Sequence, residues 1–119
     1  MSHIVLLSAS VRHGRQSDRV ALHMASHIQR EARHTLDLID LQDPGPEVLA
    51  FAERIRNADG VIIVAPEYNG SYPASLKNVI DLLTEDWRRK PIALVPVSSG
   101  AFGGSQLTTQ LVFTLWKIR

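Results

Sequence analysis

The sequence predicts an α/β fold, a doubly wound parallel sheet of four strands with a helix after each strand. Three observations predict it: apolar segments rich in branched residues, amphipathic segments with helical spacing, and their strict alternation along 119 residues. Alternating strands and helices favour a parallel sheet because each right-handed crossover places a helix on one face or the other. A composition of 45% apolar and 21% charged residues is ordinary for a globular protein, so one domain is expected over residues 1–119.

Two strand–helix units are predicted in the first half of the chain. Residues 3–8 form an apolar run typical of a strand buried on both faces. Ser17 is placed to cap a helix whose apolar residues recur at helical spacing as far as Ile28. Residues 35–41 alternate apolar side chains with aspartates, which indicates a shorter strand near an edge of the sheet. Pro46 then predicts the first turn of the second helix.

Two further units are predicted in the second half. Residues 60–65 are uncharged and mostly β-branched, which indicates a central strand, and Pro73 predicts the start of the helix that follows. Residues 87–90, a tryptophan and three basic side chains, are expected to form a solvated turn before a strand at 91–97. Leucines at intervals of four between 107 and 115 predict the last helix.

Composition excludes several classes of function. The chain has no cysteine, which excludes thiol nucleophiles, thiolate metal sites and disulfides, and fits the cytoplasm. A net charge of +1 gives no general attraction for nucleic acid or anionic lipid. The N-terminal apolar run is too short for a signal peptide, and no stretch is long enough to span a membrane. His23 and His27 lie opposite the apolar stripe of their helix, so we expect exposed side chains rather than a metal site.

The loop of residues 8–17 has the composition of a phosphate pocket. It offers several hydroxyls, the guanidinium groups of Arg12 and Arg15, and the N-terminus of a helix. Free N–H groups and the helix dipole favour an anion, and arginine can bond two of its oxygens at once. The alternative is that Ser17 only caps the helix and that both arginines are solvated.

Two more loops follow strands whose carboxyl ends should lie at the same edge of the sheet, where doubly wound folds bind ligands. Residues 66–73 hold two tyrosines and two prolines, so this loop is expected to be stiff and suited to a flat heteroaromatic ring. The alternative is a plain turn between strand and helix. Residues 98–105 include three glycines, which allow close backbone approach to a ligand.

Known nucleotide and phosphate motifs are absent from these loops. The chain has neither GxxxxGK[ST] nor GxGxxG after its first strand, which argues against an ATPase loop or the common dinucleotide fingerprint. A phosphoacceptor receiver domain would need acidic residues where residues 8–10 and 65–66 stand, and these are not acidic.

At these loops the sequence resembles the NADPH-dependent FMN reductase family of flavodoxin-like quinone, azo-dye and metal-ion reductases. The resemblance covers essentially the whole chain and rests on three signatures in order: Ser10-x-Arg12 with Ser17 downstream, Pro66-Glu67-Tyr68-Asn69-Gly70-Ser71 running into Pro73-Ala74-x-Leu76-Lys77-Asn78-x-Ile80-Asp81, and Ser99-Gly100-x-x-Gly103-Gly104. The family continues to a fifth strand that is missing here, so the domain is expected to be short at its C-terminus.

The resemblance implies FMN as cofactor and NADPH or NADH as co-substrate, with electrons passed to a quinone-like or other small acceptor. It implies no catalytic side chain and no metal, because the flavin carries the chemistry. The residues implied to bind the cofactor are Ser10, Arg12, Arg15, Gln16 and Ser17 for the phosphate, Pro66, Glu67, Tyr68, Asn69 and Gly70 for the ring, and Ser99, Gly100 and Gly103 near its pyrimidine end. Tyr68 and Tyr72 are expected to shape the open face of the ring.

Self-association is also expected. An outermost strand at 91–97 would have an unpaired edge, and Val112, Phe113 and Trp116 add more apolar surface to the last helix than one buried stripe requires. A homodimer or homotetramer would cover these surfaces. The alternative function is a non-enzymatic flavin- or phosphate-binding module or electron carrier, although the net charge of +1 differs from the strongly acidic surface of flavodoxin-type carriers.

Overall fold

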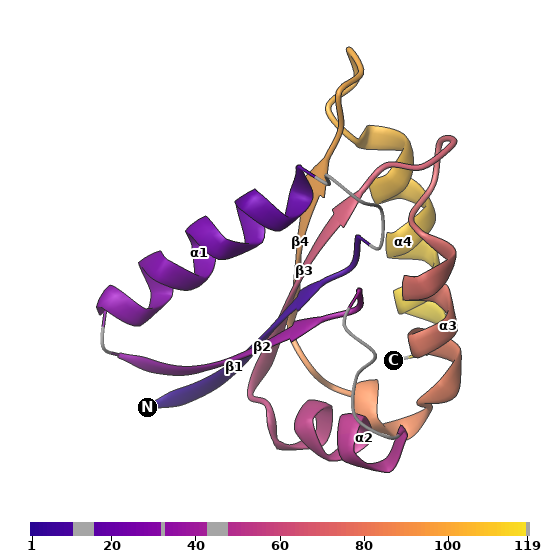
Figure 1. The fold of residues 1–119 in the computed structure, drawn as a ribbon. Coiled ribbons are helices and arrows are strands. Elements are labelled where there is room, and N and C mark those ends of the chain that lie inside the picture. The colour runs from indigo at the N-terminus through magenta and orange to yellow at the C-terminus, as the bar shows by residue number, and fades with distance from the viewer. Residues whose placement is uncertain (11–15, 32, 43–47, 119) are drawn as a thin grey trace.

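The structure is a computed structural model that describes residues 1–10, 16–31, 33–42 and 48–118, without the side chain of Val48. A parallel sheet is flanked by helices on both faces (Figure 1). The elements, in chain order, are β1 (Ser2–Ser8), α1 (Ser17–Glu31), β2 (His34–Asp40), α2 (Val48–Asn57), β3 (Gly60–Pro66), α3 (Ala74–Leu82), the 3-10 helix η1 (Glu85–Trp87), β4 (Ile92–Val97) and α4 (Ser105–Lys117). The predicted alternation is therefore confirmed.

The strand order is β2-β1-β3-β4, and all three pairings are parallel. As predicted, β2 lies at an edge and β3 is central, and β4 is the outermost strand on the other side. The chain moves from β1 outward to β2 and then returns past β1 to β3, so the order of the strands reverses between β1 and β3. In folds of this kind the reversal opens a crevice at the carboxyl ends of the two strands.

The two faces of the sheet are covered unequally. Helices α2, α3 and α4 cover one face, and α1 lies on the other (Figure 1). Successive side chains of a strand point to opposite faces, so Val5 and Leu7 join the three-helix side and Leu6 joins α1. On the α1 side of β3 and β4, Ile62 and Val95 are only partly buried, although Val64 of β3 is fully buried there. The three-helix side therefore holds the larger part of the core.

The expected solvated turn is confirmed at Arg88 and Arg89, which are exposed residues of a turn, but it is wrong for Trp87, which is buried. Trp87 ends η1 and is only 2% exposed, with its indole N–H donating to the carbonyl of Ile80 at 3.3 Å. Its ring meets Phe51 of α2 edge-on. Lys90 donates from Nζ to the carbonyl of Ala58 at 2.8 Å. Trp87 thus closes the core at the amino ends of the strands, because a large apolar side chain gains free energy from burial while Arg88 and Arg89 stay in solvent.

Three helices begin at the carboxyl edge of the sheet: α1 at Ser17, α3 after Pro73 and α4 after Gly104. Pro73 precedes the first helical residue with φ −62° and ψ 145°, so the predicted start of this helix is confirmed to within one residue. In the described part of the chain no helix is both long and apolar enough to cross a membrane.

Candidate functional site

The loops that follow β1, β3 and β4 meet at the carboxyl edge of the sheet. The backbone N–H of Ala9 donates to the carbonyl of Val64 at 2.9 Å, which extends the β1–β3 pairing beyond the strands. The hydroxyl of Ser75 reaches back to the carbonyl of Ala9 at 3.2 Å. On the other side of β3, the N–H of Glu67 donates to the carbonyl of Val97 at 2.9 Å. The three turns are therefore joined by direct hydrogen bonds.

The loop after β3 is stiff because it contains a two-residue hairpin. Tyr68 and Ser71 exchange both backbone hydrogen bonds, at 2.8 and 3.0 Å, around Asn69 and Gly70. Both turn residues have positive φ, 52° and 75°, as a type I′ turn requires. The Asn-Gly pair is the sequence signal for such a turn and could have predicted it.

Both tyrosines of this loop are held by their hydroxyls. Tyr68 shares a hydrogen bond of 2.9 Å with the hydroxyl of Ser10, a residue with no exposed surface. Tyr72 shares one of 2.8 Å with Thr114 of α4, and its ring packs against the core on the three-helix side. Tyr68 therefore ties the hairpin to β1, whereas Tyr72 ties the loop to α4.

Glu67 connects the hairpin to the start of α4. Its Oε1 accepts the backbone N–H of Leu107 at 3.0 Å, and its Oε2 lies 3.4 Å from the donating hydroxyl of Ser98. Gly104, which precedes α4, makes no side-chain cap, so the carboxylate from the other loop takes that place. A negative charge is favourable at this end of a helix. Nothing in the local sequence around Glu67 or Leu107 predicts this contact.

The glycine loop after β4 is exposed from Ser99 to Gly103, and Gly104 behind it is buried. Gly104 has φ +81°, and a Cβ on it would lie 2.6 Å from the Cβ of Pro96. Phe102, at the middle of the loop, is 75% exposed. The loop therefore exposes its backbone and one aromatic side chain at the carboxyl edge of the sheet. Only glycine fits at position 104, where the loop joins α4.

The N-terminus of α1 holds a buried hydroxyl that bonds to none of the described residues. Ser17 is 1% exposed, and among the described residues no group bonds to its Oγ. A second such hydroxyl, that of Ser8, lies at the end of β1. A buried polar atom without a partner costs free energy unless a ligand or water satisfies it. The hydroxyl of Ser17 thus fits a bound anion. At the start of α4, by contrast, the N–H of Leu107 already donates to the protein's own Glu67 carboxylate.

The described candidates gather at this edge of the sheet. Ser10 is buried, Gln16 is exposed with its Oε1 accepting from Arg19 at 3.3 Å, and Asn69 projects at the tip of the hairpin. Arg12 and Arg15 lie outside the described residues. We define the rim by residues 8–10, 16–17, 66–73 and 98–104.

Among the described residues, the displaced pKa values belong to ion pairs outside the rim. Hydrogen bonds from Arg54, at 2.5 and 2.8 Å, lower the pKa of Asp37 below its ordinary value. A hydrogen bond to Asp81 raises the pKa of Lys77. His23 and His27 are exposed, as predicted, and the described residues include no group of three potential metal ligands.

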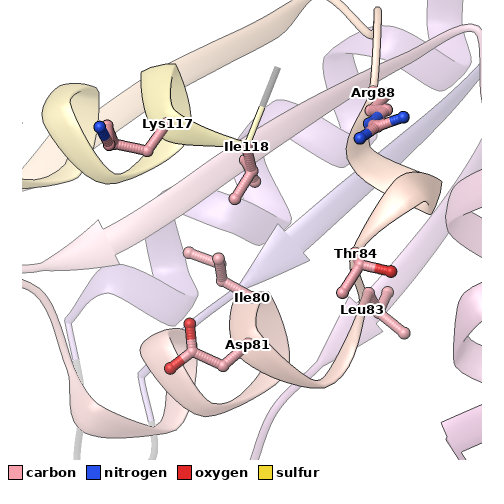
Figure 2. A pocket seen from close by; sticks show the side chains of 7 residues that line it. All are labelled: Ile80, Asp81, Leu83, Thr84, Arg88, Lys117 and Ile118. Carbon is pink, nitrogen blue, oxygen red and sulfur yellow. The ribbon is translucent and has the colours of Figure 1, made fainter.

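A pocket of about 310 Å³ lies at the opposite end of the molecule, between the last turns of α3 and α4 (Figure 2). Its charged side chains include Asp81 and Arg88, which are engaged with Lys77 and Glu85 respectively. The C-terminal ends of helices carry partial negative charge, which disfavours an anion. This pocket is therefore a poorer candidate for an anionic ligand than the rim.

Comparison with known proteins agrees with this arrangement of loops. The model of the NADPH-dependent FMN reductase family matches residues 2–118. The chain belongs to this family. An NAD(P)H-dependent FMN reductase of Schizosaccharomyces pombe is 32% identical over 127 aligned residues, which cover 91% of this chain and 62% of that protein. A quinone reductase of Escherichia coli is 48% identical over 63 residues, which cover 50% of this chain and 34% of that protein.

Solved structures show that the likeness extends from the sequence to the fold of the chain. The flavoenzyme NAD(P)H:(acceptor) oxidoreductase of Paracoccus denitrificans superposes with a TM-score of 0.82 at 27% identity, over 99% of this chain and 72% of that one. An NADH:FMN oxidoreductase in its apo form gives 0.87 at 20% identity, over 99% and 70%, which shows the shared fold. The fold is therefore flavodoxin-like, as predicted. The chain spans 62% and 34% of the length of the two curated relatives above.

Proposed function

We propose that this protein is an FMN-dependent NAD(P)H oxidoreductase that passes electrons to a quinone-like or other small acceptor. The observation that carries the proposal is the buried hydroxyl of Ser17 at the start of α1, which no other described residue bonds, beside loops that meet at one rim. Membership of the FMN reductase family supports it, as do relatives named FMN reductase and quinone reductase.

The phosphate of FMN would bind at the start of α1. Ser17 offers there a buried hydroxyl that no other described residue bonds, at a helix N-terminus, where N–H groups and the helix dipole favour an anion. Gln16 and Ser10 are its described neighbours along the chain. Arg12 and Arg15 are proposed from the resemblance alone as the guanidinium partners of the phosphate.

The flavin ring would lie against the backbone of Pro66–Gly70, with Ser99, Gly100 and Gly103 near its pyrimidine end. The type I′ turn supports this assignment because its backbone is already ordered, so binding a flat ring costs little conformational entropy. The exposed backbone of the glycine loop can approach the ring edge without a side chain between them.

When bound, FMN would supply the redox chemistry by accepting a hydride from NADPH or NADH and releasing its electrons to the acceptor. The protein's own residues would bind and orient. The rim would leave one face of the ring open, so that donor and acceptor occupy the same place in turn. No side chain is proposed as nucleophile or general base.

The proposed setting is a cytoplasmic homodimer or homotetramer that binds neither membrane nor nucleic acid. The outer face of α4 supports self-association, because Phe113 and Trp116 are 64% and 52% exposed with their rings 6.3 Å apart. The absence of cysteine supports a reducing compartment. The net charge of +1 argues against a nucleic-acid partner.

Anaerobic titration tests the proposal. The purified protein, reconstituted with FMN, should show a flavin absorption band that NADPH or NADH bleaches and that a quinone restores. A protein that takes up no FMN would contradict the proposal at its first step. If the protein binds FMN but neither NADPH nor NADH reduces it, the result would instead support the alternative, a flavin-binding module without reductase activity.

A further inference from the structure

Glu67 holds both ends of the glycine loop with one carboxylate. One end of the loop is Ser98, whose hydroxyl donates to Oε2, and the other is the first turn of α4, whose Leu107 N–H donates to Oε1. The hydroxyl of Ser98 also accepts the N–H of Gly100 at 3.0 Å, so the connection reaches into the loop itself. The exposed backbone between these points is thus attached to the loop after β3.

This contact also fixes the distance between two parts of the rim. Glu67 immediately precedes the hairpin of Tyr68–Ser71, and its own N–H is bonded to the carbonyl of Val97 at the end of β4. Gly70 of the hairpin lies close to α4, because a Cβ on it would be 3.1 Å from Oε1 of Gln106. Backbone, carboxylate and close packing therefore hold the hairpin and the glycine loop in one relative position.

Both carboxylate oxygens of Glu67 have a donor within the protein. We propose that Glu67 is a positioning residue whose side chain sets the gap between the two loops for the flavin ring, instead of binding the cofactor itself. This inference rests on the proposed function, because the ring is what the gap would hold. A carboxylate suits the task because it accepts two bonds at once and places its charge at the start of α4.

The test compares Glu67→Ala, which removes the carboxylate, with Glu67→Gln, which keeps an oxygen for the Leu107 N–H. Glu85→Ala is the matched control, because it removes an exposed glutamate at the opposite end of the molecule. Two quantities are measured: amide hydrogen exchange at Leu107 and Gly100 without flavin, and the dissociation constants of FMN and riboflavin.

Glu67→Ala should speed exchange at Leu107 and Gly100, and it should weaken FMN and riboflavin by the same factor, about tenfold, the size expected for a lost helix cap. Equal loss for both flavins identifies an effect at the ring, because riboflavin has no phosphate. Glu67→Gln should keep both affinities within about threefold of wild type. Glu85→Ala should change neither measurement.

A loss of flavin affinity in Glu67→Ala with unchanged exchange at Leu107 would overturn the positioning role in favour of direct contact. So would unchanged affinity with faster exchange, because the gap would then not matter to the ring. If Glu67→Ala does not fold, Glu67→Asp, which keeps the charge on a shorter side chain, should show the same losses. A wild-type protein that binds neither flavin would overturn the proposed function itself, and exchange at Leu107 would still report the tether.

Discussion

The hydroxyl of Ser10 lies 2.9 Å from the hydroxyl of Tyr68, 58 residues further along the chain. This contact joins the end of β1 to the hairpin after β3, across the point where the order of the strands reverses. The proposed phosphate site follows β1 and the proposed ring site follows β3. A hydrogen bond between two side chains thus connects the two places that one FMN molecule would occupy.

Tyr68→Phe removes this connection and leaves the ring in place. We expect the free energy of unfolding to fall by about 1 kcal/mol, since the hydroxyl of Ser10 is buried and loses one of its hydrogen bonds. FMN affinity should fall as well. Tyr72→Phe is the matched control, because it removes a similar bond to Thr114 on α4 without touching β1. Urea unfolding and FMN titration of both variants check the prediction, and equal FMN affinities would contradict it.

Ser17→Ala distinguishes a ligand-binding hydroxyl from a helix cap. The Oγ of Ser17 makes no cap bond within the described residues, so the flavin-free variant should be as stable as wild type, whereas loss of a working cap costs about 1 kcal/mol. FMN should bind about tenfold more weakly, the equivalent of about 1.4 kcal/mol, and riboflavin should be unaffected.

Ser105→Ala provides the matching change at the start of α4, where the serine is exposed. This variant should bind FMN and riboflavin as tightly as wild type. A stability loss in Ser17→Ala with unchanged FMN binding would favour the simple capping role.

Gly104→Ala should be strongly destabilising. Comparison with Gly103→Ala should separate the cost of positive φ from the cost of a steric clash. Both glycines have positive φ, 81° and 60°, so both alanines carry a backbone cost of about 1–2 kcal/mol. A Cβ at Gly104 also meets Pro96 at 2.6 Å, whereas one at Gly103 has no atom within 4 Å. Overpacking should add about 1–3 kcal/mol to Gly104→Ala alone. Thermal or urea unfolding measures the difference, and two equally stable variants would refute the clash.

The Asp37–Arg54 pair predicts a pH-dependent contribution to stability. Arg54 lowers the pKa of Asp37, so folding favours the ionised carboxylate. The contribution to stability is complete above the pH range in which carboxyl groups ordinarily titrate, and it is lost as the pH falls below about 4. Because the pair is partly exposed, Asp37→Asn should cost about 0.5–1 kcal/mol near neutral pH, and the difference from wild type should shrink in acid.

Asp81→Asn offers the comparison, since it breaks the exposed pair with Lys77. Its stability difference from wild type should be smaller than that of Asp37→Asn at neutral pH. A difference between Asp37→Asn and wild type that does not change with pH would exclude the linkage.

The fold could be predicted from sequence because each strand and helix carries its own local pattern. The uncharged β-branched run of β3 and the leucines of α4 are such patterns, and they survive in the structure. Trp87 was misjudged because its three basic neighbours indicate solvent, whereas contacts with Phe51 and Ile80, distant in sequence, bury it. Tertiary contacts of this kind leave no trace in a short window of residues.

The site could be predicted only in part. Parallel strands bring the loops after β1, β3 and β4 to one edge, so their meeting follows from the order of the elements. The hairpin at Asn69 and Gly70 had a usable signal in the Asn-Gly pair. The bond between Glu67 and Leu107 had none, because it depends on how the loop after β3 packs against α4. Periodicity cannot report such packing.

Hydrogen exchange with and without FMN tests the central claim most directly, that one flavin is held by three turns at a single rim. The account predicts that FMN slows amide exchange at residues 8–10 and 16–17, at 66–73 and at 98–104 together, and leaves Thr84 and Arg88 of the opposite pocket unchanged. Slowed exchange at that pocket, or at one of the three turns without the others, would contradict it.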